Sequence, residues 1–360
     1  MSWGKRGLWI VFWGLIFPLS SADAADLTLA CLPILCYHQI SAQPLTEYGV
    51  SGADFRAQMD YLKEKGYATI PLSRWIQARK GAASLPPRPV ILTFDDGYSS
   101  AYTEVFPLLL AHGFTGTFFI STQYPGQPSH YLTSTQLREM ARAGMEIMPH
   151  GHSHANLVKR KADETQGRYR ARVRRELTQS RSLLEARLRR PCPFFAYPYG
   201  AYDQEVEEIA KEAHFELILT ACPGTNTPKT HLFRLKRQFI YRDDGLEGFR
   251  RKLEALPLEA QFPFAEGAVL SRSPQEIVVG LPRLDCFGSS PLLLLDRREV
   301  ASSYDATAFK ISYAPPAPLQ KGLHLLEVRI IEKGSGRWYQ DSTLFAVRPT
   351  RGGISRRDEP

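Results

Sequence analysis

The chain has 360 residues, of which 43% are hydrophobic and 23% charged, and 45 lysines and arginines against 37 acidic residues give a formal charge of +8. This length has room for about two domains, and the apolar fraction excludes a disordered or collagen-like protein. Five cysteines are too few for a disulfide scaffold. The basic residues are scattered and no nucleic-acid motif accompanies them, so we expect no nucleic-acid partner.

The chain opens on the features of a secretory signal peptide. Lys5 and Arg6 precede an apolar run over residues 8–17, and an A-x-A cleavage signature ends at Ala24. The run is about half the roughly 20 residues needed to span a bilayer, which argues against a membrane anchor. We therefore expect residues 1–24 to be removed and the mature protein to be secreted or periplasmic, without a transmembrane segment.

Export would place the five cysteines in an oxidising compartment, where disulfides can form. They are Cys31, Cys36, Cys192, Cys222 and Cys286. The odd number leaves at least one of them unpaired, and the sequence does not assign partners.

Residues 32–256 alternate between short apolar strands and amphipathic helices. The predicted strands cover residues 33–37, 89–94, 115–120, 145–148, 194–197, 215–219 and 237–241. The predicted helices cover residues 51–66, 101–111, 133–143, 163–188 and 204–213, with Ser51 and a Thr133–Gln136 capping box as starting signals. This alternation predicts a parallel sheet, open or closed into a barrel, with functional residues at the carboxyl ends of the strands.

The pattern changes after residue 256. Pro257, Pro263 and Pro274 indicate a break in the chain, with a linker over residues 257–267, and strands without intervening helices follow. These strands are predicted at residues 276–279, 292–295, 308–313, 325–331 and 344–347. Their regular spacing predicts a small antiparallel β-sandwich over residues 268–350, followed by a tail over 351–360.

The strongest local motif is an acidic pair, Asp95 and Asp96, within the sequence TFDDG at the end of an apolar strand. Two adjacent carboxylates repel each other unless a cation or a proton relieves the repulsion. Asp-Gly is also an ordinary turn dipeptide, so by itself the motif fits a turn equally well.

Three of the nine histidines fall within five residues, at His150, His152 and His154, after another short strand. Neutral imidazole binds divalent metals, and one carboxylate with two histidines leaves positions open for water and substrate, as in catalytic sites. A surface cluster without a ligand is the alternative. The acidic pair and the histidines together favour a metal site.

A third motif, FAYPYG at residues 195–200, also follows a strand. Its proline and glycine indicate a turn whose backbone N–H groups can face an oxyanion, while tyrosine rings can stack on a sugar. Tyr197 and Pro198 are therefore candidates for substrate binding. Tyr48, Tyr98 and Tyr124 are further candidates for a sugar groove, although core packing is the commoner fate of an aromatic residue.

In this order, the three motifs resemble the polysaccharide deacetylase family, which has the NodB-homology fold of carbohydrate esterase family 4. The resemblance covers about residues 33–256. It implies that residues 25–256 form a deacetylase domain with a distorted (β/α) barrel fold. It further implies that the protein removes acetyl groups from N-acetylated sugars with the help of a divalent metal.

The resemblance also implies roles for individual residues. Asp95 would be the general base, and Asp96, His150 and His154 would bind the metal. The backbone of Tyr199 would contribute to the oxyanion hole. Two histidines and a carboxylate suit zinc most, although iron, cobalt and nickel are also compatible.

The segment before the first motif narrows the resemblance. LPILCYH at residues 32–38, followed by V-S-x-x-x-F-x-x-Q-M-x-Y-L at 50–62, is similar to secreted deacetylases of biofilm poly-N-acetylglucosamine. In that branch a late histidine element is moved to the N-terminus, which makes His38 the general acid. A structural histidine that caps a strand is the alternative.

The chain departs from the family pattern at two positions. Gly151 stands where a serine or threonine often follows the first histidine ligand, and Ala196 stands where many members have an arginine that orients the base. Arg237 is a candidate replacement for that arginine, and otherwise a candidate for substrate contact. His152 is an extra candidate ligand whose spacing does not match the motif.

The sequence thus predicts a metal-dependent hydrolase that removes N-acetyl groups from an N-acetylglucosamine-containing exopolysaccharide. A glycan-binding protein with a vestigial site and a glycoside hydrolase with paired carboxylates are the alternatives. Peptidoglycan, chitin-like oligosaccharides and O-acetyl esters stay open as substrates. Residues 319–347 resemble a bacterial immunoglobulin-like module, which would bind glycan or a protein partner, or position the barrel.

Overall fold

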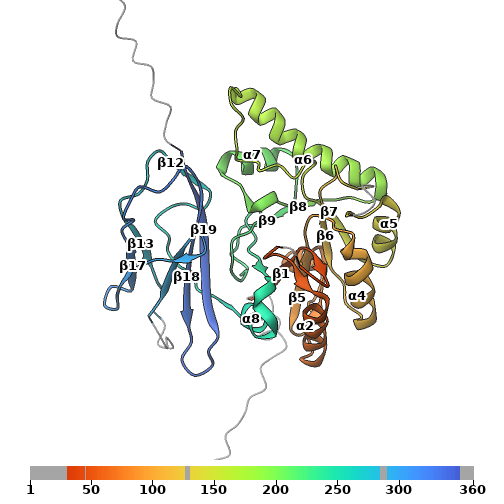
Figure 1. Cartoon of the computed structure of the whole chain (residues 1–360), viewed down its shortest axis with the longest axis horizontal. Coiled ribbons are helices and arrows are strands. Elements are labelled where there is room, and N and C mark those ends of the chain that lie inside the picture. The colour runs from red at the N-terminus through yellow and green to blue at the C-terminus, as the bar shows by residue number, and fades with distance from the viewer. Residues whose placement is uncertain (1–30, 45, 126–129, 284–289, 349–360) are drawn as a thin grey trace, which may run out of the picture.

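The structure is a computed structural model that describes residues 31–348 except 45, 126–129 and 284–289. The predicted signal peptide, the predicted tail and Cys286 lie outside the described residues. An α/β module, coloured red to teal, lies beside a β module coloured blue (Figure 1). Within the described part of the chain, no helix combines the length and the apolar character that crossing a membrane requires.

A parallel sheet forms the centre of the α/β module, in the order β10-β1-β5-β6-β7, with β4 added beside β5. Its strands are β1 Ile34–Tyr37, β4 Ala68–Thr69, β5 Pro89–Phe94, β6 Thr117–Ile120, β7 Glu146–Pro149 and β10 Gln238–Phe239. β1, β5 and β6 are buried along their whole length, which explains their continuous apolar sequences. The predicted parallel sheet is confirmed.

Two shorter parallel pairs accompany this sheet, β2 Ile40–Ser41 with β3 Val50–Ser51, and β8 Phe194–Ala196 with β9 Leu217–Leu219. A single bridge joins Leu219 to Leu235 just before β10. Among the described residues no strand pairing joins β7 to β8. The closed barrel therefore stays a prediction.

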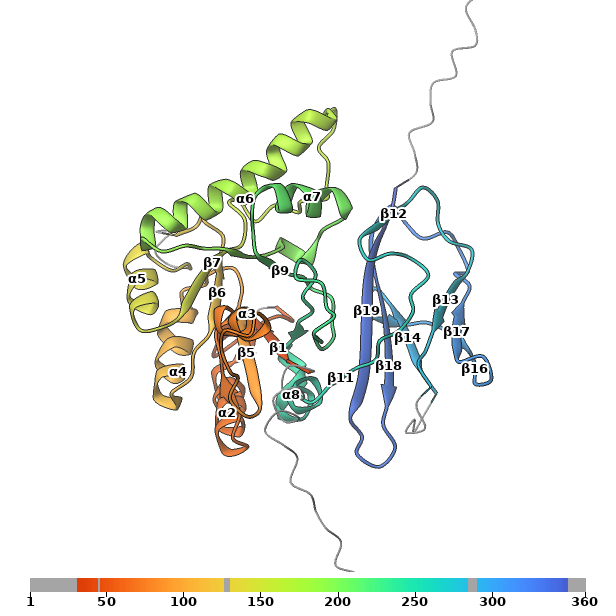
Figure 2. The same cartoon turned by 180° about the vertical axis from the view of Figure 1, so that it is seen from behind.

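Helices surround the sheet, with α4 and α5 on the side away from the β module, α8 on the side toward it and α2 between α4 and α8 (Figures 1 and 2). The helices are α2 Gly52–Glu64, α3 Leu72–Arg79, α4 Phe106–His112, α5 Ser134–Arg142, α6 Gln166–Leu188, α7 Gln204–Glu212 and α8 Gly245–Leu253. The predicted caps are confirmed, since Ser51 accepts the Asp54 N–H and Thr133 forms a capping box with Gln136.

Two predicted helices differ in detail. The helix expected from residue 101 begins as a π-helical segment, η1 Ala101–Val105, because Pro107 has no N–H to donate to the preceding turn. The helix expected from residue 163 begins at Gln166, since Asp163 has a φ of 56° and Thr165 caps the first turn.

The β module consists of two sheets. One has the order β11-β19-β18-β14-β15 with β12 also on β19, and the other has the order β13-β17-β16. The strands are β11 Leu256–Pro257, β12 Ala268–Leu270, β13 Ile277–Gly280, β14 Leu292–Leu295, β15 Arg298–Glu299, β16 Ser303–Asp305, β17 Lys310–Tyr313, β18 Gly322–Ile331 and β19 Trp338–Val347. The immunoglobulin-like assignment stays a prediction.

The expectation of a purely antiparallel module is wrong. β11 and β12 pair in parallel with β19, the last strand of the chain. No hairpin connects these distant segments, so nothing forces them to run antiparallel. β11 ends at the first residue of the predicted linker, residues 257–267, and β12 begins directly after its last residue. Their pairing with β19 holds both ends of this segment on the β module.

The two modules share an interface along β18 and β19. Leu344 belongs to an apolar cluster of the α/β module, and Leu323 and Leu325 pack against the same cluster. Polar contacts add to it, because Lys236 pairs with Asp341 and the Gln238 amide donates to Gln340 at 2.7 Å. The β module is thus docked on the α/β module through a mixed apolar and polar surface.

Candidate active site

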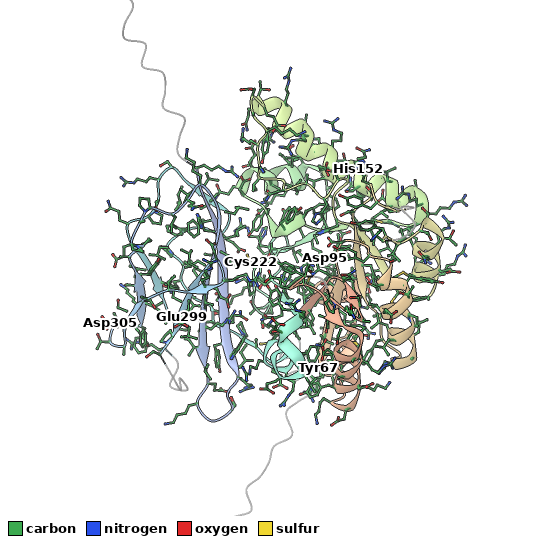
Figure 3. All side chains as sticks on the ribbon, in the orientation of Figure 1. Tyr67, Asp95, His152, Cys222, Glu299 and Asp305 are labelled. Atoms are coloured by element: carbon green, nitrogen blue, oxygen red, sulfur yellow. The ribbon has the colours of Figure 1, made fainter. Side chains whose placement is uncertain are left out.

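The candidate site lies at the carboxyl ends of neighbouring strands, as the sequence predicts. His38 follows β1, Asp95 and Asp96 follow β5, and His150 follows β7. Parallel strands end at one edge of the sheet, which brings residues that are more than 100 positions apart together. In Figure 3, Asp95 lies inside the α/β module on the side that faces the β module.

One cluster joins Asp96, His150 and His154, whose ligand atoms lie within 4.8 Å of one another. Asp96 Oδ1 lies 3.1 Å from His154 Nε2 and 3.5 Å from His150 Nε2. This oxygen is buried and makes no hydrogen bond of ordinary geometry with the described residues. An oxygen left in this way between two imidazole nitrogens fits a shared divalent cation.

The orientation of His150 follows from a hydrogen bond to the neighbouring strand. Its Nδ1 lies 2.8 Å from the Ala196 carbonyl at the end of β8, so Nδ1 carries the proton and Nε2 keeps its lone pair. The ring is only 2% exposed. Burial lowers the pKa of His150 to about 4, which keeps the imidazole neutral and able to bind a metal.

The loops that carry the cluster contain left-handed backbone. Asp96 has a φ of 76° and His154 a φ of 55°, and neither is a glycine. Such conformations cost free energy and persist where the surrounding structure demands them, which is common at functional sites.

Asp95 points to a different partner, the guanidinium of Arg237. Arg237 Nη1 donates to Oδ1 at 2.7 Å and Nη2 donates to Oδ2 at 2.8 Å, while Nε donates to the Thr220 carbonyl. Both side chains are buried, at 3% exposed for Asp95 and 1% for Arg237. Burial alone would raise the pKa of Asp95, but Arg237 and then His150 outweigh it and hold the pKa well below its usual range.

The position of Arg237 bears on the arginine missing at residue 196. The sequence offered Arg237 as a replacement for it or as a substrate contact. The hydrogen bonds of its guanidinium go to Asp95, Thr220 and Thr93, and the group also lies over the Phe239 ring. These contacts favour the first hypothesis, and the role of Arg237 stays a prediction.

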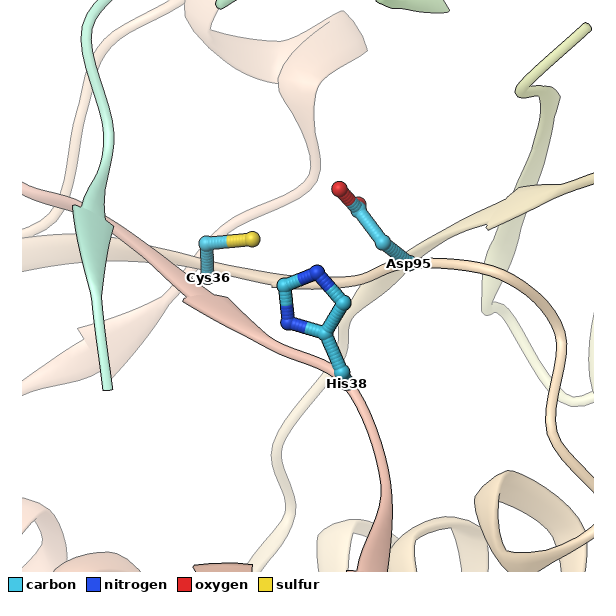
Figure 4. A group of neighbouring side chains, drawn as sticks. All are labelled: Cys36, His38 and Asp95. Carbon is cyan, nitrogen blue, oxygen red and sulfur yellow. The ribbon is translucent and has the colours of Figure 1, made fainter. Parts of the chain in front are cut away.

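His38 follows β1, the strand between β10 and β5, and belongs to a second cluster that contains Asp95. Ligand atoms of Cys36, His38 and Asp95 lie within 4.8 Å of one another, and Figure 4 shows the three side chains converging from β1 and β5. His38 Nδ1 is buried and has no hydrogen-bond partner among the described residues. Burial lowers the pKa of His38 and raises that of the Cys36 thiol, so both groups are neutral at pH 7.

The PYG turn forms a further wall of the site. It is a 3₁₀ turn, η2 Pro198–Gly200, in which Tyr199 has a φ of 59° and a ring that is 65% exposed and 4.6 Å from the His154 ring. A Cβ on Gly200 would lie 2.1 Å from Ala221 Cβ, so this close approach requires glycine. The Gly200 and Ala201 N–H groups already donate to the Tyr197 and Pro198 carbonyls. That the Tyr199 N–H binds an oxyanion stays a prediction.

His152 is not part of the metal cluster. Its Nδ1 lies 3.0 Å from Thr122 Oγ1 and its Nε2 lies 3.5 Å from the Gln179 side chain. The cluster of described residues that can hold an ion contains the other two histidines of the motif instead. His152 therefore holds the loop against its neighbours.

Glu176 is a residue that the sequence analysis missed. From α6, its Oε2 accepts the N–H groups of His152 and Ser153 at 2.9 Å, and its Oε1 accepts the Ser153 hydroxyl at 2.6 Å. It thereby fixes the histidine loop, in which Gly151 has a φ of 81°. No motif in the sequence marks it among the many charges of α6.

A cavity of about 500 Å³ contains the site. Tyrosines make up much of its lining, namely Tyr48, Tyr98, Tyr124, Tyr131, Tyr197, Tyr199 and Tyr241. The rings of Tyr98, Tyr131 and Tyr124 form a stack, with centroids 5.6 and 4.7 Å apart. The tyrosines that the sequence suggested for a sugar groove all line the cavity, namely Tyr48, Tyr98, Tyr124 and Tyr197, whereas Pro198 does not. That these tyrosines bind sugar stays a prediction.

The α/β fold, the carboxylate paired with an arginine and the adjacent Asp–His cluster fit the class of hydrolases that use a divalent metal. Comparison with known proteins adds the family. The sequence model of the polysaccharide deacetylase family matches residues 82–218.

Three relatives support this match. YxkH of Bacillus subtilis, named as a polysaccharide deacetylase, is 28% identical over 208 residues, which are 58% of this chain and 71% of YxkH. The poly-β-1,6-N-acetyl-D-glucosamine N-deacetylase of Staphylococcus aureus is 24% identical over 216 residues, 59% of this chain and 74% of its own. The solved structure of IcaB from Ammonifex degensii is 25% identical with a TM-score of 0.54, and covers 62% of this chain and 97% of IcaB.

These findings identify the chain as a relative of the polysaccharide deacetylases, hydrolases that act on amide bonds, with a NodB-like fold in its α/β module. More than a third of this chain has no counterpart in the IcaB structure.

Proposed function

We propose that the protein hydrolyses the N-acetyl groups of an N-acetylglucosamine-containing exopolysaccharide and releases acetate. The observation that carries the proposal is the pairing of two carboxylates with two different partners. Asp95 is held ionised by Arg237, and Asp96 faces two imidazole nitrogens. The name of the staphylococcal relative supports the choice of a poly-N-acetylglucosamine polymer.

Asp96, His150 and His154 would hold one divalent ion. Two imidazoles and one carboxylate suit zinc, and iron, cobalt or nickel also bind such a set. When bound, the ion supplies Lewis-acid polarisation of the acetamide carbonyl and lowers the pKa of water at the site. The buried Asp96 Oδ1 and the free lone pair of His150 Nε2 support this assignment.

Asp95 acts as the general base in this proposal. It takes the proton from a water molecule that attacks the acetamide carbonyl carbon. Because Arg237 lowers the pKa of Asp95, the carboxylate is available as a base at neutral pH. The bidentate contact also fixes the orientation of the carboxylate, so Arg237 is a positioning residue.

His38 returns a proton to the leaving amine. Because burial lowers its pKa, His38 is neutral in the free protein at pH 7 and must first receive a proton. The protonated carboxyl of Asp95 is a nearby source, since ligand atoms of the two groups lie within 4.8 Å of each other. One proton of the attacking water thereby passes through Asp95 and His38 to the amine nitrogen as the C–N bond breaks. The other proton leaves with the acetic acid, which ionises to acetate at neutral pH, and a free amine remains on the sugar.

The turn at Tyr199 stabilises the negative charge of the tetrahedral intermediate through its backbone N–H. Its exposed ring stands beside His154, at the mouth of the cavity, where it can contact the sugar. Tyr197 also lines the cavity, but it is fully buried and contacts Tyr202 in a stacked pair. We therefore assign the sugar contact to Tyr199 rather than to Tyr197.

A signal peptide at residues 1–24 would export the protein, which fits a polymeric substrate outside the cytoplasm. We further propose that residues 25–256 form the deacetylase domain and residues 268–350 the second domain. The β module would be an immunoglobulin-like sandwich that positions the α/β module or contributes to glycan binding. Its close docking supports both roles.

Acetate release tests the function directly. The purified protein is incubated with poly-N-acetylglucosamine, a chitin oligosaccharide and an O-acetylated glycan, each with and without a chelator. We expect acetate from the N-acetylated polymer, loss of release with the chelator and recovery with zinc. Polymer binding without acetate under any metal would indicate a glycan-binding protein, and chelator-insensitive release of reducing ends would indicate a glycoside hydrolase.

A further inference from the structure

One loop of the β module reaches the wall of the active-site cavity. β14 and β15 form a hairpin in which Leu295 pairs with Arg298, so Asp296 and Arg297 make a two-residue loop. Both have positive φ, 50° for Asp296 and 68° for Arg297. This is the backbone of a type I′ turn, in which asparagine and glycine are favoured and an arginine is strained.

The loop is held in this strained conformation by β18. Asp296 Oδ2 lies 2.8 Å from His324 Nδ1, and Asp296 Oδ1 accepts the Leu325 N–H at 2.9 Å. The Asp296 N–H also donates to the Leu325 carbonyl. The aspartate of the loop therefore serves the hairpin, whereas the arginine beside it points out of the module.

The Arg297 side chain lies across residues of the α/β module. Its Nη1 is 3.0 Å from Glu47 Oε1 and 3.2 Å from the Tyr48 hydroxyl. Its guanidinium carbon lies 4.5 Å from the centre of the Tyr241 ring, within the range of a cation–π contact. Arg297, Tyr48 and Tyr241 all line the cavity that contains Asp95 and His150.

The placement of Arg297 does not depend on the hairpin alone. Leu325 and Leu344, from β18 and β19, line the same cavity. The pairs Lys236–Asp341 and Gln238–Gln340 fix those strands against the segment that leads into β10. The β module is thus positioned to form part of the site.

From this geometry we propose that the β14–β15 hairpin completes the substrate site and that Arg297 binds the sugar unit next to the one that is deacetylated. The inference rests on the proposed function and deepens it. Glu47 neutralises the charge of Arg297, which suits an uncharged N-acetylhexosamine chain rather than an anionic polymer. The guanidinium, held over the Tyr241 ring, would donate to sugar hydroxyls while the neighbouring Tyr48 presents its ring to the sugar.

The strain at residue 297 separates a binding role from a structural one. Glycine adopts a φ of 68° without strain, so an Arg297→Gly variant removes the side chain and relaxes the loop at the same time. The contacts it loses in the free protein are the exposed ion pair with Glu47, the hydrogen bond with the Tyr48 hydroxyl and the cation–π contact with Tyr241. Exposed contacts of these kinds each contribute at most about 1 kcal/mol, and the relaxed loop offsets part of the loss. We expect its melting temperature to stay within about 3 °C of the wild type.

Binding is measured in an Asp95→Asn background, so that turnover does not consume the ligand. Binding of an N-acetylglucosamine pentamer and of the monomer is followed by calorimetry, with and without Arg297→Gly. Arg298→Ala is the matched control, because this arginine is the next residue of the hairpin and does not line the cavity. We expect Arg297→Gly to weaken pentamer binding about tenfold and Arg298→Ala to leave it unchanged.

Equal binding of the pentamer by the variant with Arg297→Gly and its parent would overturn the inference, and so would an equal loss caused by Arg298→Ala. Absence of pentamer binding by the parent would overturn it as well. Acetate release by the protein with Asp95 intact is scored separately. Pentamer binding that depends on Arg297 without any acetate release would refute the proposed function and leave the hairpin's role standing.

Discussion

Buried charged and polar groups have different roles in the two modules. In the α/β module, Asp95, Arg237 and His150 are buried around a cavity that opens between strand ends. In the β module, Glu327 and Gln340 are buried where β18 and β19 face the α/β module, and Gln340 links Glu327 to Gln238 across the interface. Buried charge needs compensation in both places. In the first set Arg237 compensates Asp95 while His150 Nε2 keeps an open lone pair, whereas in the second set the hydrogen bonds through Gln340 join the two modules.

The largest expected effect concerns the base. Asp95→Asn should lower acetate release by about 10³-fold, since the amide cannot accept the proton of water. Its metal content should stay at the wild-type level, because Asp96 and not Asp95 belongs to the ion-holding cluster with His150 and His154. Elemental analysis and an acetate assay on the same sample check both points. Loss of the metal together with activity would reassign Asp95 as a ligand.

The next effect concerns the buried ion pair. Arg237→Ala leaves Asp95 buried without its partner, so we expect a loss of about 3–5 kcal/mol in the free energy of unfolding. Turnover should fall too, as the pKa of Asp95 rises and its orientation is lost. Denaturant unfolding measures the first effect. An Arg237→Met, Asp95→Asn double variant is the control, and it should recover most of the stability; unchanged turnover in Arg237→Ala would remove Arg237 from the mechanism.

The pH dependence of stability tests the burial of His150 in the α/β module. The pKa of His150 is lowered to about 4 in the folded protein, against about 6.5 in an unfolded chain. The unfolded state therefore binds this proton first, and the metal-free protein should lose up to about 3 kcal/mol as the pH falls from 6.5 to 4. Thermal unfolding across this range measures the loss, and His150→Asn should reduce the slope, while His38, whose pKa burial also lowers, leaves a remaining pH dependence. Equal slopes for both proteins would show that His150 is not the cause.

The smallest effect concerns the module interface. Lys236→Met leaves Asp341 without its cation at a largely buried position, and we expect a loss of about 1–3 kcal/mol. Lys229→Met is the matched control, since the Lys229–Glu259 pair is exposed and should contribute little. Urea unfolding of both variants provides the comparison. Equal losses would mean that the buried pair does not fix the β module.

The sequence predicted the parts of the site that follow strand ends. Asp95, Asp96 and His150 stand directly after apolar runs, and parallel strands necessarily bring such ends together. Arg237 could be suggested, but its bidentate contact with Asp95 joins residues 142 positions apart and no local pattern encodes it. Glu176 was missed for the same reason.

The β module was harder to predict. The sequence predicted residues 325–331 of β18 but only residues 344–347 of β19, which spans Trp338–Val347. The parallel pairing of β11 and β12 with β19 depends on how the chain returns from the α/β module. The reach of Arg297 into the cavity depends on the docking of two modules, which the sequence of either one does not contain.

The central claim is that one divalent ion, held by Asp96, His150 and His154, is required for acetate release. The most direct measurement is a titration of the metal-free protein with zinc while acetate release from poly-N-acetylglucosamine is followed. The account predicts that the rate of acetate release is zero without zinc, rises linearly with added zinc and reaches a plateau at one equivalent per chain. The Asp96→Ala variant should show no such rise. Full release without metal would contradict it, as would a plateau at two equivalents, which would place an active ion at Cys36, His38 and Asp95.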